Sequence, residues 1–175
     1  MSTISMLCAD DLGQHAAELG ALMQACVLDG ASIGYVLPFT AQDGEAFWTK
    51  AVLPALRKGG RLLLVAWREG LIVGTVQLDF DTPPNQPHRA EVRKLMVHPA
   101  YRRQGIAQAL MAAVERYAAV LGRSLLTLDT RSGDVAQALY AALGYQVVGM
   151  IPGYCRDALS SRLDATTIMY KAMPA

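Results

Sequence analysis

The spacing of apolar residues along the chain predicts an alternation of helices and strands. Apolar residues recur at three- and four-residue intervals over residues 10–28, 40–58, 104–122 and 134–143, which is the spacing of amphipathic helices. Shorter apolar runs bounded by glycine, proline and polar residues are typical of strands. These runs cover residues 3–8, 61–68, 71–81, 90–98, 124–130, 145–151 and 165–173.

Local signals refine the first two helices. Asp10-Asp11 offers an N-cap to the first helix, and Thr40 has the character of a second helix start. Within the second helix, the spacing of Phe47, Ala51 and Leu56 predicts one buried face.

Turn chemistry and element order predict the topology. Glu69-Gly70 separates two strands and indicates an antiparallel hairpin. In the second half of the chain, strands alternate with helices, which favours right-handed crossovers and parallel pairing. Residues 30–39, 82–88 and 152–164 are predicted to be loops. We therefore expect one α/β domain over residues 1–175, with a mixed sheet of about seven strands and about four helices.

Composition narrows the class of protein. The chain has 175 residues, of which 53% are hydrophobic and 18% charged, so it can bury a sizeable core. The net charge of +1 gives no global attraction to nucleic acid or to an anionic membrane. The longest apolar run, residues 62–67, is far shorter than the roughly 18 residues that span a bilayer. We expect neither nucleic acid nor membrane as a partner.

The cysteines indicate a reducing compartment. Cys8, Cys26 and Cys155 are too few and too scattered for a disulfide framework or a zinc site. The N-terminus shows no basic segment followed by a long apolar stretch, so no secretory signal is predicted. We expect a cytoplasmic protein with no bound metal.

The segment from Val97 to Ala107 has the features of a phosphate-binding turn. A predicted strand ends at a proline, a basic turn with Arg102 and Arg103 follows, and a long helix begins just after Gly105. A helix start presents unpaired N–H groups and the positive end of the macrodipole. Glycine and alanine here leave that backbone accessible, and the arginines add charge.

The order of elements and two motifs resemble the GNAT superfamily of acyl-CoA-dependent N-acetyltransferases. The acyl-CoA motif of that family (Arg or Gln, two of any residue, Gly, any, Gly or Ala) corresponds here to Arg102-Arg103-Gln104-Gly105-Ile106-Ala107. A second family segment corresponds to Ala136, Leu139-Tyr140, Gly144 and Tyr145.

The resemblance extends over residues 3–172 and has one departure. Where the family carries an asparagine that contacts the pantetheine arm, this chain has Gly133, with Asp134 beside it. Residues 128–134 and 151–154 look nearest to the tabtoxin-resistance type of small-molecule acetyltransferase.

The resemblance implies acetyl-CoA as the acyl donor. The backbone N–H groups of Arg103 to Ala107 would bind the pyrophosphate. In the family, the fourth strand separates from the fifth, and its free backbone binds the pantetheine arm as an added strand would. Carried over, this names Leu95, Met96 and Val97, and a main-chain N–H there would polarise the thioester carbonyl.

The resemblance also names catalytic candidates. Tyr140 aligns with a tyrosine near the thioester sulfur, where a phenol can protonate the leaving thiolate; the alternative is a tyrosine packed in the core. Glu91 lies where several family members keep a general base. Strand alternation puts Glu91 and Val97 on one face of an unbulged strand. The alternative for Glu91 is an ion pair with Arg93 or Lys94.

Asp129, at the end of the fifth predicted strand, is a second candidate base, or else a cap on the following turn. The family commonly builds its acceptor pocket from an early loop and a late loop. Here the candidates are Ser32, Tyr35, Phe39 and Tyr154, and loop packing is the alternative for each.

These features together predict an N-acetyltransferase that moves an acetyl group from acetyl-CoA to a primary amine by direct attack in a ternary complex. The expected acceptor is an amino-acid-like or antibiotic-like small molecule. Alternatives are a non-catalytic acyl-CoA-binding regulatory domain and a protein N-terminal or lysine acetyltransferase. Edge strands near the C-terminus could pair between chains and give a homodimer.

Overall fold

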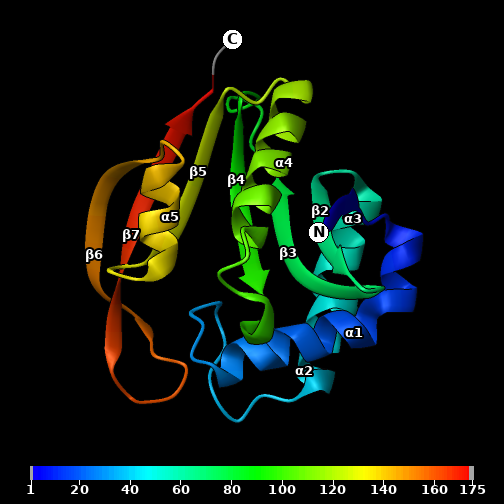
Figure 1. The fold of residues 1–175 in the computed structure, drawn as a ribbon. Coiled ribbons are helices and arrows are strands. Elements are labelled where there is room, and N and C mark those ends of the chain that lie inside the picture. Colours follow the sequence, from blue (N-terminus) through cyan, green and yellow to red (C-terminus); the bar gives the residue numbers. More distant parts are fainter. Residues whose placement is uncertain (1, 174–175) are drawn as a thin grey trace.

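One mixed sheet of seven strands organises the computed structural model, which describes residues 2–173 (Figure 1). The strand order is β1-β2-β3-β4-β5-β7-β6. The strands are β1 (Thr3–Met6), β2 (Arg61–Arg68), β3 (Leu71–Asp79), β4 (Arg89–Val97), β5 (Leu125–Arg131), β6 (Gln146–Arg156) and β7 (Leu163–Ala172). The helices are α1 (Ala9–Leu28), α2 (Ala41–Phe47), α3 (Leu53–Lys58), α4 (Ile106–Val120) and α5 (Val135–Ala142). The predicted mixed α/β sheet is confirmed.

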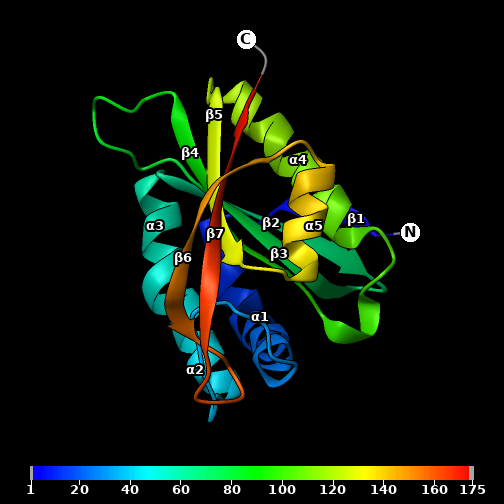
Figure 2. The same cartoon turned by 90° about the vertical axis from the view of Figure 1, so that its left-hand side faces the viewer.

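Helices cover both faces of the sheet (Figure 2). On one face, α4 packs with buried residues such as Leu110 and Met111 against β2, β3 and β4. On the other face, α1 to α3 enclose a second core that includes Leu12, Met23 and Trp48. Within residues 2–173, no helix is both long enough and apolar enough to cross a bilayer.

The helix starts follow local side-chain chemistry. Thr40 caps α2 in a reciprocal capping box with Asp43, which confirms the predicted start. The cap of α1 is Cys8, whose Sγ accepts a hydrogen bond from the Asp11 backbone N–H at 3.4 Å, so the predicted Asp10-Asp11 cap is wrong. Both aspartates lie instead in the first turn, where they complement the helix dipole.

A π-helical segment, Trp48–Val52, joins α2 to α3 and changes the buried face. The wider turn rotates the following side chains relative to a regular α-helix. Trp48 and Val52 are fully buried, whereas Ala51 is exposed. Phe47 and Leu56 pack against the core as predicted, but Ala51 does not, because the prediction assumed an unbroken 3.6-residue period.

The pairing of the last strands also differs from the prediction. The β2–β3 hairpin is antiparallel as expected, and β4 pairs with β5 in parallel. However, β7 lies between β5 and β6 and is antiparallel to both. The predicted loop at residues 152–164 is shorter in the structure and covers residues 157–162. On one side, β6 continues to Arg156 through a register irregularity between Ile151 and Cys155, and on the other side β7 begins at Leu163.

A β-bulge in β4 reverses the faces of its side chains. Thr75 pairs with Met96 and Gln77 with Arg93, so two residues of β4 lie opposite one of β3. Lys94, in this bulge, has a φ of 52°. Val92 precedes the bulge and Val97 follows it, yet both pack on the α4 side. Glu91 and Val97 thus lie on opposite faces, which corrects the same-face expectation for an unbulged strand.

The contact between α1 and α2 depends on two glycines. A Cβ on Gly20 would lie 2.5 Å from the Ala41 carbonyl oxygen, and one on Gly44 would lie 2.6 Å from the Gly20 oxygen. Glycine weakens a helix interior by roughly 1 kcal/mol relative to alanine, so close backbone packing accounts for these two residues.

We expect Gly20→Ala to destabilise the protein by about 2 kcal/mol, because overpacking outweighs the gain in helix propensity. Gly13→Ala, in the same helix with nothing within 4 Å of its added Cβ, should stabilise it by about 0.5 kcal/mol. Urea unfolding of both variants measures whether each change lowers or raises the free energy of unfolding. Equal stabilisation by both changes would contradict the close packing.

Candidate active site

The start of α4 presents an open set of backbone N–H groups. Gly105 is the N-cap residue with a φ of 77°, and no side chain caps this helix start. Arg103 also has a positive φ, 62°. Left-handed residues beside a helix start turn successive N–H groups toward one side, which suits an anion. A Cβ on Gly105 would meet nothing within 4 Å, so the space beside this backbone is open.

The side chains of the same turn differ in their contacts. Arg102 forms an ion pair with Asp29 at the end of α1, and its Nε donates to the Val97 carbonyl oxygen at 3.2 Å. Gln104 Oε1 accepts a hydrogen bond from Arg68 at 2.7 Å. Arg103 is exposed and has no ion-pair partner within residues 2–173. Of the two predicted phosphate-binding arginines, only Arg103 has a guanidinium left uncommitted.

The edge of β4 that faces β5 is open beyond its first residues. The two strands pair only over Arg89–Glu91 and Leu125–Thr127, and then diverge (Figure 1). Leu95, Met96 and Val97 lie in the diverging part, where the backbone on this edge is not paired with β5. Such an edge can accept an extended ligand as an added strand.

Tyr140 lies on α5 and is buried, with its ring 5.8 Å from that of Tyr145. Burial raises the pKa of the Tyr140 phenol well above its ordinary value, and the negative charges of Asp129 and Asp134 raise it further. The phenol therefore keeps its proton at neutral pH. Tyr140 is thus packed in the core and protonated, and its role as the acid of the reaction stays a prediction.

The two candidate bases differ in their surroundings. Asp129 is exposed on β5, and its Oδ2 accepts a hydrogen bond from the Thr166 hydroxyl at 3.2 Å. Its charge acts on both Tyr140 and Lys94. Glu91 has its Oε1 3.7 Å from Arg93 Nε, which is one of the ion pairs considered as its alternative role.

The two predicted acceptor loops are in direct contact. The Leu37 backbone N–H donates to the Ala158 carbonyl oxygen at 3.0 Å, and Ser32 Oγ lies 3.6 Å from Cys155 Sγ. The early and late segments therefore lie against each other, and their role as an acceptor pocket stays a prediction. Tyr154, in contrast, is an exposed residue of β6.

The aromatic candidates of the early loop form a cluster. The Tyr35 ring centroid lies 4.8 Å from that of Phe39 and 5.9 Å from that of Phe47. Phe39 is 94% buried, with only 6% of its surface exposed, and belongs mainly to the core. A shallow pocket of about 530 Å³ lies beside this cluster, and its lining includes neither Tyr140 nor Asp129.

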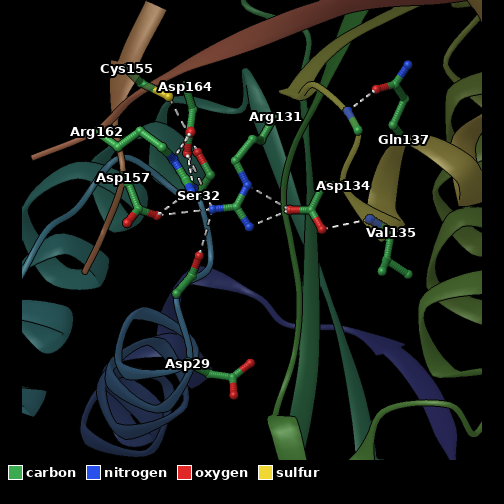
Figure 3. A network of polar contacts seen from close by, with 12 residues as sticks. Asp29, Ser32, Arg131, Asp134, Val135, Gln137, Cys155, Asp157, Arg162 and Asp164 are labelled. Atoms are coloured by element: carbon green, nitrogen blue, oxygen red, sulfur yellow. Dashed lines mark hydrogen bonds and ion pairs between the residues drawn. The ribbon is translucent and has the colours of Figure 1, made fainter. Parts of the chain in front are cut away.

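Arg131 is the centre of an ionic network that joins these segments (Figure 3). Its guanidinium donates to Asp134 at 2.9 Å, to the Gly30 carbonyl oxygen at 3.0 Å and to Asp157 at 3.5 Å. Asp164 lies 3.7 Å away. Arg131 therefore connects the end of β5 to the end of α1, the start of α5 and the loop before β7.

Within this network, Asp134 both caps a helix and binds Arg131. Its Oδ1 accepts a hydrogen bond from the Val135 N–H at 2.7 Å and caps α5, while its Oδ2 binds Arg131. Its carboxylate is thus already engaged at the position suggested for a pantetheine contact. The three-residue spacing of Arg131 and Asp134 was the only sequence signal for this network, whose other partners are distant along the chain.

Comparisons with known proteins identify the family. The model of the acetyltransferase (GNAT) family matches residues 16–145. The chain belongs to this family, and the resemblance seen in the sequence is confirmed. Human N-acetyltransferase 8 is 36% identical over 96 residues, which is 54% of this chain and 42% of the human protein. The chain thus spans less than half of that relative.

Solved structures show the same fold. The putative acetyltransferase yncA from Salmonella typhimurium, described with its cofactor acetyl-CoA, has a TM-score of 0.77 at 19% identity and covers 99% of this chain and 94% of its own. A putative phosphinothricin N-acetyltransferase has a TM-score of 0.79 at 17% identity, with both chains covered completely at 100%. At these sequence identities, the similarity shows a shared fold.

We expect Arg131→Met to destabilise the protein by about 2 kcal/mol, because it removes the ion-pair partner of Asp134 and one of the two cations beside Asp157 and Asp164, all of which are partly buried. Arg162→Met is the matched control, since the more exposed Arg162 pairs with the same Asp157 and Asp164 and should cost less than about 1 kcal/mol. Guanidinium unfolding at neutral pH measures both changes.

The difference in stability between the wild type and Arg131→Met should depend on pH. A hydrogen bond from Ser160, aided by Arg162 and Arg131, lowers the pKa of Asp157. A lowered pKa means that this stabilisation is present at neutral pH and is lost as the pH falls through the folded-state value. The difference in the free energy of unfolding between the wild type and Arg131→Met should therefore become smaller at acidic pH. A gap that widens in acid would contradict the network.

Proposed function

We propose that the protein is an N-acetyltransferase that moves an acetyl group from acetyl-CoA to the primary amine of a small molecule, by direct attack in a ternary complex. The observation that carries this proposal is the divergence of β4 from β5 together with the open start of α4, because the two provide places for an extended arm and for a phosphate. The acetyl-CoA in the description of yncA and the acceptor in that of the phosphinothricin enzyme support it.

Acetyl-CoA fits the residues present. Its pyrophosphate would meet the free N–H groups from Arg103 to Ala107 and the uncommitted guanidinium of Arg103. Its pantetheine arm would pair with the backbone groups that Leu95 to Val97 turn toward this edge, apart from the Val97 carbonyl oxygen, which already accepts from Arg102. When bound, it supplies the activated acyl group as a thioester.

The chain's own residues then provide proton transfer and charge stabilisation. Asp129 or Glu91 accepts the proton of the attacking amine, directly or through water. A backbone N–H of the open β4 edge stabilises negative charge on the carbonyl oxygen. Tyr140 gives its proton to the departing sulfur.

The proposal includes a cytoplasmic location, supported by the few scattered cysteines. It also includes a homodimer, supported by the open edge of β6. This strand lies at the end of the sheet, and exposed apolar side chains such as Val148 and Met150 lie along it. An unpaired strand edge of this kind is a template for pairing with a second chain.

Release of free thiol from acetyl-CoA across a panel of small amines tests the reaction. Tyr140→Phe should lower kcat about 100-fold and leave the Kd for acetyl-CoA unchanged, because the phenol acts on the leaving group. Tyr117→Phe, a half-buried tyrosine on α4, is the control. Tight acetyl-CoA binding without thiol release from any amine would favour a regulatory binding domain instead. Turnover of peptide N-termini or lysines alone would favour a protein acetyltransferase.

The base is tested by the pH profile of kcat/KM. Glu91→Gln or Asp129→Asn should lower kcat/KM by about 100-fold and weaken its dependence on pH, because a carboxylate that accepts the amine proton is lost. The variant with the larger effect identifies the base. An unchanged profile in both variants and in the double variant would refute general-base catalysis by this pair.

A further inference from the structure

Lys94 is a largely buried cation on β4 whose side chain reaches the early loop. Its Nζ donates one hydrogen bond to the Ile33 carbonyl oxygen at 2.8 Å and lies 5.6 Å from the centre of the Phe47 ring. Lys171, which is also largely buried, instead forms an ion pair with Glu115 at 2.8 Å. Within residues 2–173, no carboxylate forms an ion pair with Lys94, so its ammonium retains hydrogen-bonding capacity.

The backbone is arranged to hold this side chain in place. Lys94 has a φ of 52°, a left-handed conformation that is unfavourable for a residue with a Cβ. Buried Thr75 on β3 fixes the bulge, because its hydroxyl donates to the Lys94 carbonyl oxygen at 3.0 Å. Strained residues of this kind cluster at functional sites.

The ammonium is also in an unfavourable environment. Burial lowers the pKa of Lys94, and the nearby charge of Arg93 lowers it further. The negative charges of Asp129 and Glu91 act in the opposite direction but do not overcome burial. An anionic ligand at the ammonium would compensate for this cost.

The surrounding charges define what kind of anion fits. The charges that act on Lys94 are those of two cations, Arg93 and Arg61, and of two carboxylates, Asp129 and Glu91. Glu91 forms an ion pair with Arg93. Because these four charges balance, Lys94 adds a single positive charge, which matches a ligand with a single negative charge. The same carboxylates attract an ammonium group. A small molecule with both a carboxylate and an amine therefore matches this face of β4 and β5.

We propose that Lys94 binds the carboxylate of the acceptor, so that the acceptor is a small amino acid whose amine faces Asp129 and Glu91. This inference rests on the proposed function, since that amine is the group to be acetylated. Lys94 would act as a specificity residue through a charge-assisted hydrogen bond. The exposed Arg156 of β6 is the rival cation for the same carboxylate.

Binding to the complex with CoA tests this inference without turnover. The probes are the twenty standard L-amino acids, each beside its carboxamide, titrated by calorimetry into the protein saturated with CoA. In the wild type, at least one amino acid should bind about 30-fold more tightly than its carboxamide. Lys94→Met should remove this difference, while Lys50→Met, at an exposed lysine, should keep it.

The outcomes separate the two proposals. Equal binding of every amino acid and its carboxamide in the wild type overturns the role of Lys94, as does a difference that survives Lys94→Met or disappears in Arg156→Met. Absence of thiol release with any amine contradicts the acetyltransferase proposal alone. An unchanged Kd for CoA in Lys94→Met shows that the fold is intact.

Discussion

The short pairing between β4 and β5 is the constraint on which the candidate site depends. The strands share only Arg89–Glu91 and Leu125–Thr127. Beyond that point, β4 stays paired with β3 and β5 stays paired with β7, and the edge of β4 that faced β5 loses its partner. Full pairing would occupy the backbone groups that an extended ligand needs. The same divergence leaves the bulge at Lys94 free to face the acceptor loops.

Donor and acceptor ends of the site use different parts of the chain. The donor end consists mainly of backbone, namely the open edge of β4 and the start of α4, and its geometry is set by regular elements. The proposed acceptor end combines side chains of β4 and β5, namely Lys94, Glu91 and Asp129, with loops that are held by Arg131 and by contacts such as Leu37 to Ala158. In the proposed function, rigid elements would therefore hold the constant co-substrate, and the loops would supply much of the variation in the acceptor pocket.

These differences explain what the sequence could predict. Helices, hairpin and phosphate-binding turn depend on local patterns, and the boundaries of α4 and α5 lie within about two residues of those expected. The π-helical turn at Trp48–Val52, the insertion of β7 between β5 and β6, and the β4 bulge depend on distant partners. Lys94 and Arg131 were missed for the same reason, because Ile33 and Asp157 are far from them in sequence.

The role of Arg131 has a consequence for exchanging segments between relatives. Both loops near the acceptor and the first turn of α5 meet one guanidinium, so none of them is an independent module. A grafted late loop would need its own acidic residue at the place of Asp157, and a grafted early loop would need a carbonyl at the place of Gly30. A loop exchange meant to change the acceptor preference must therefore keep the groups that bind Arg131.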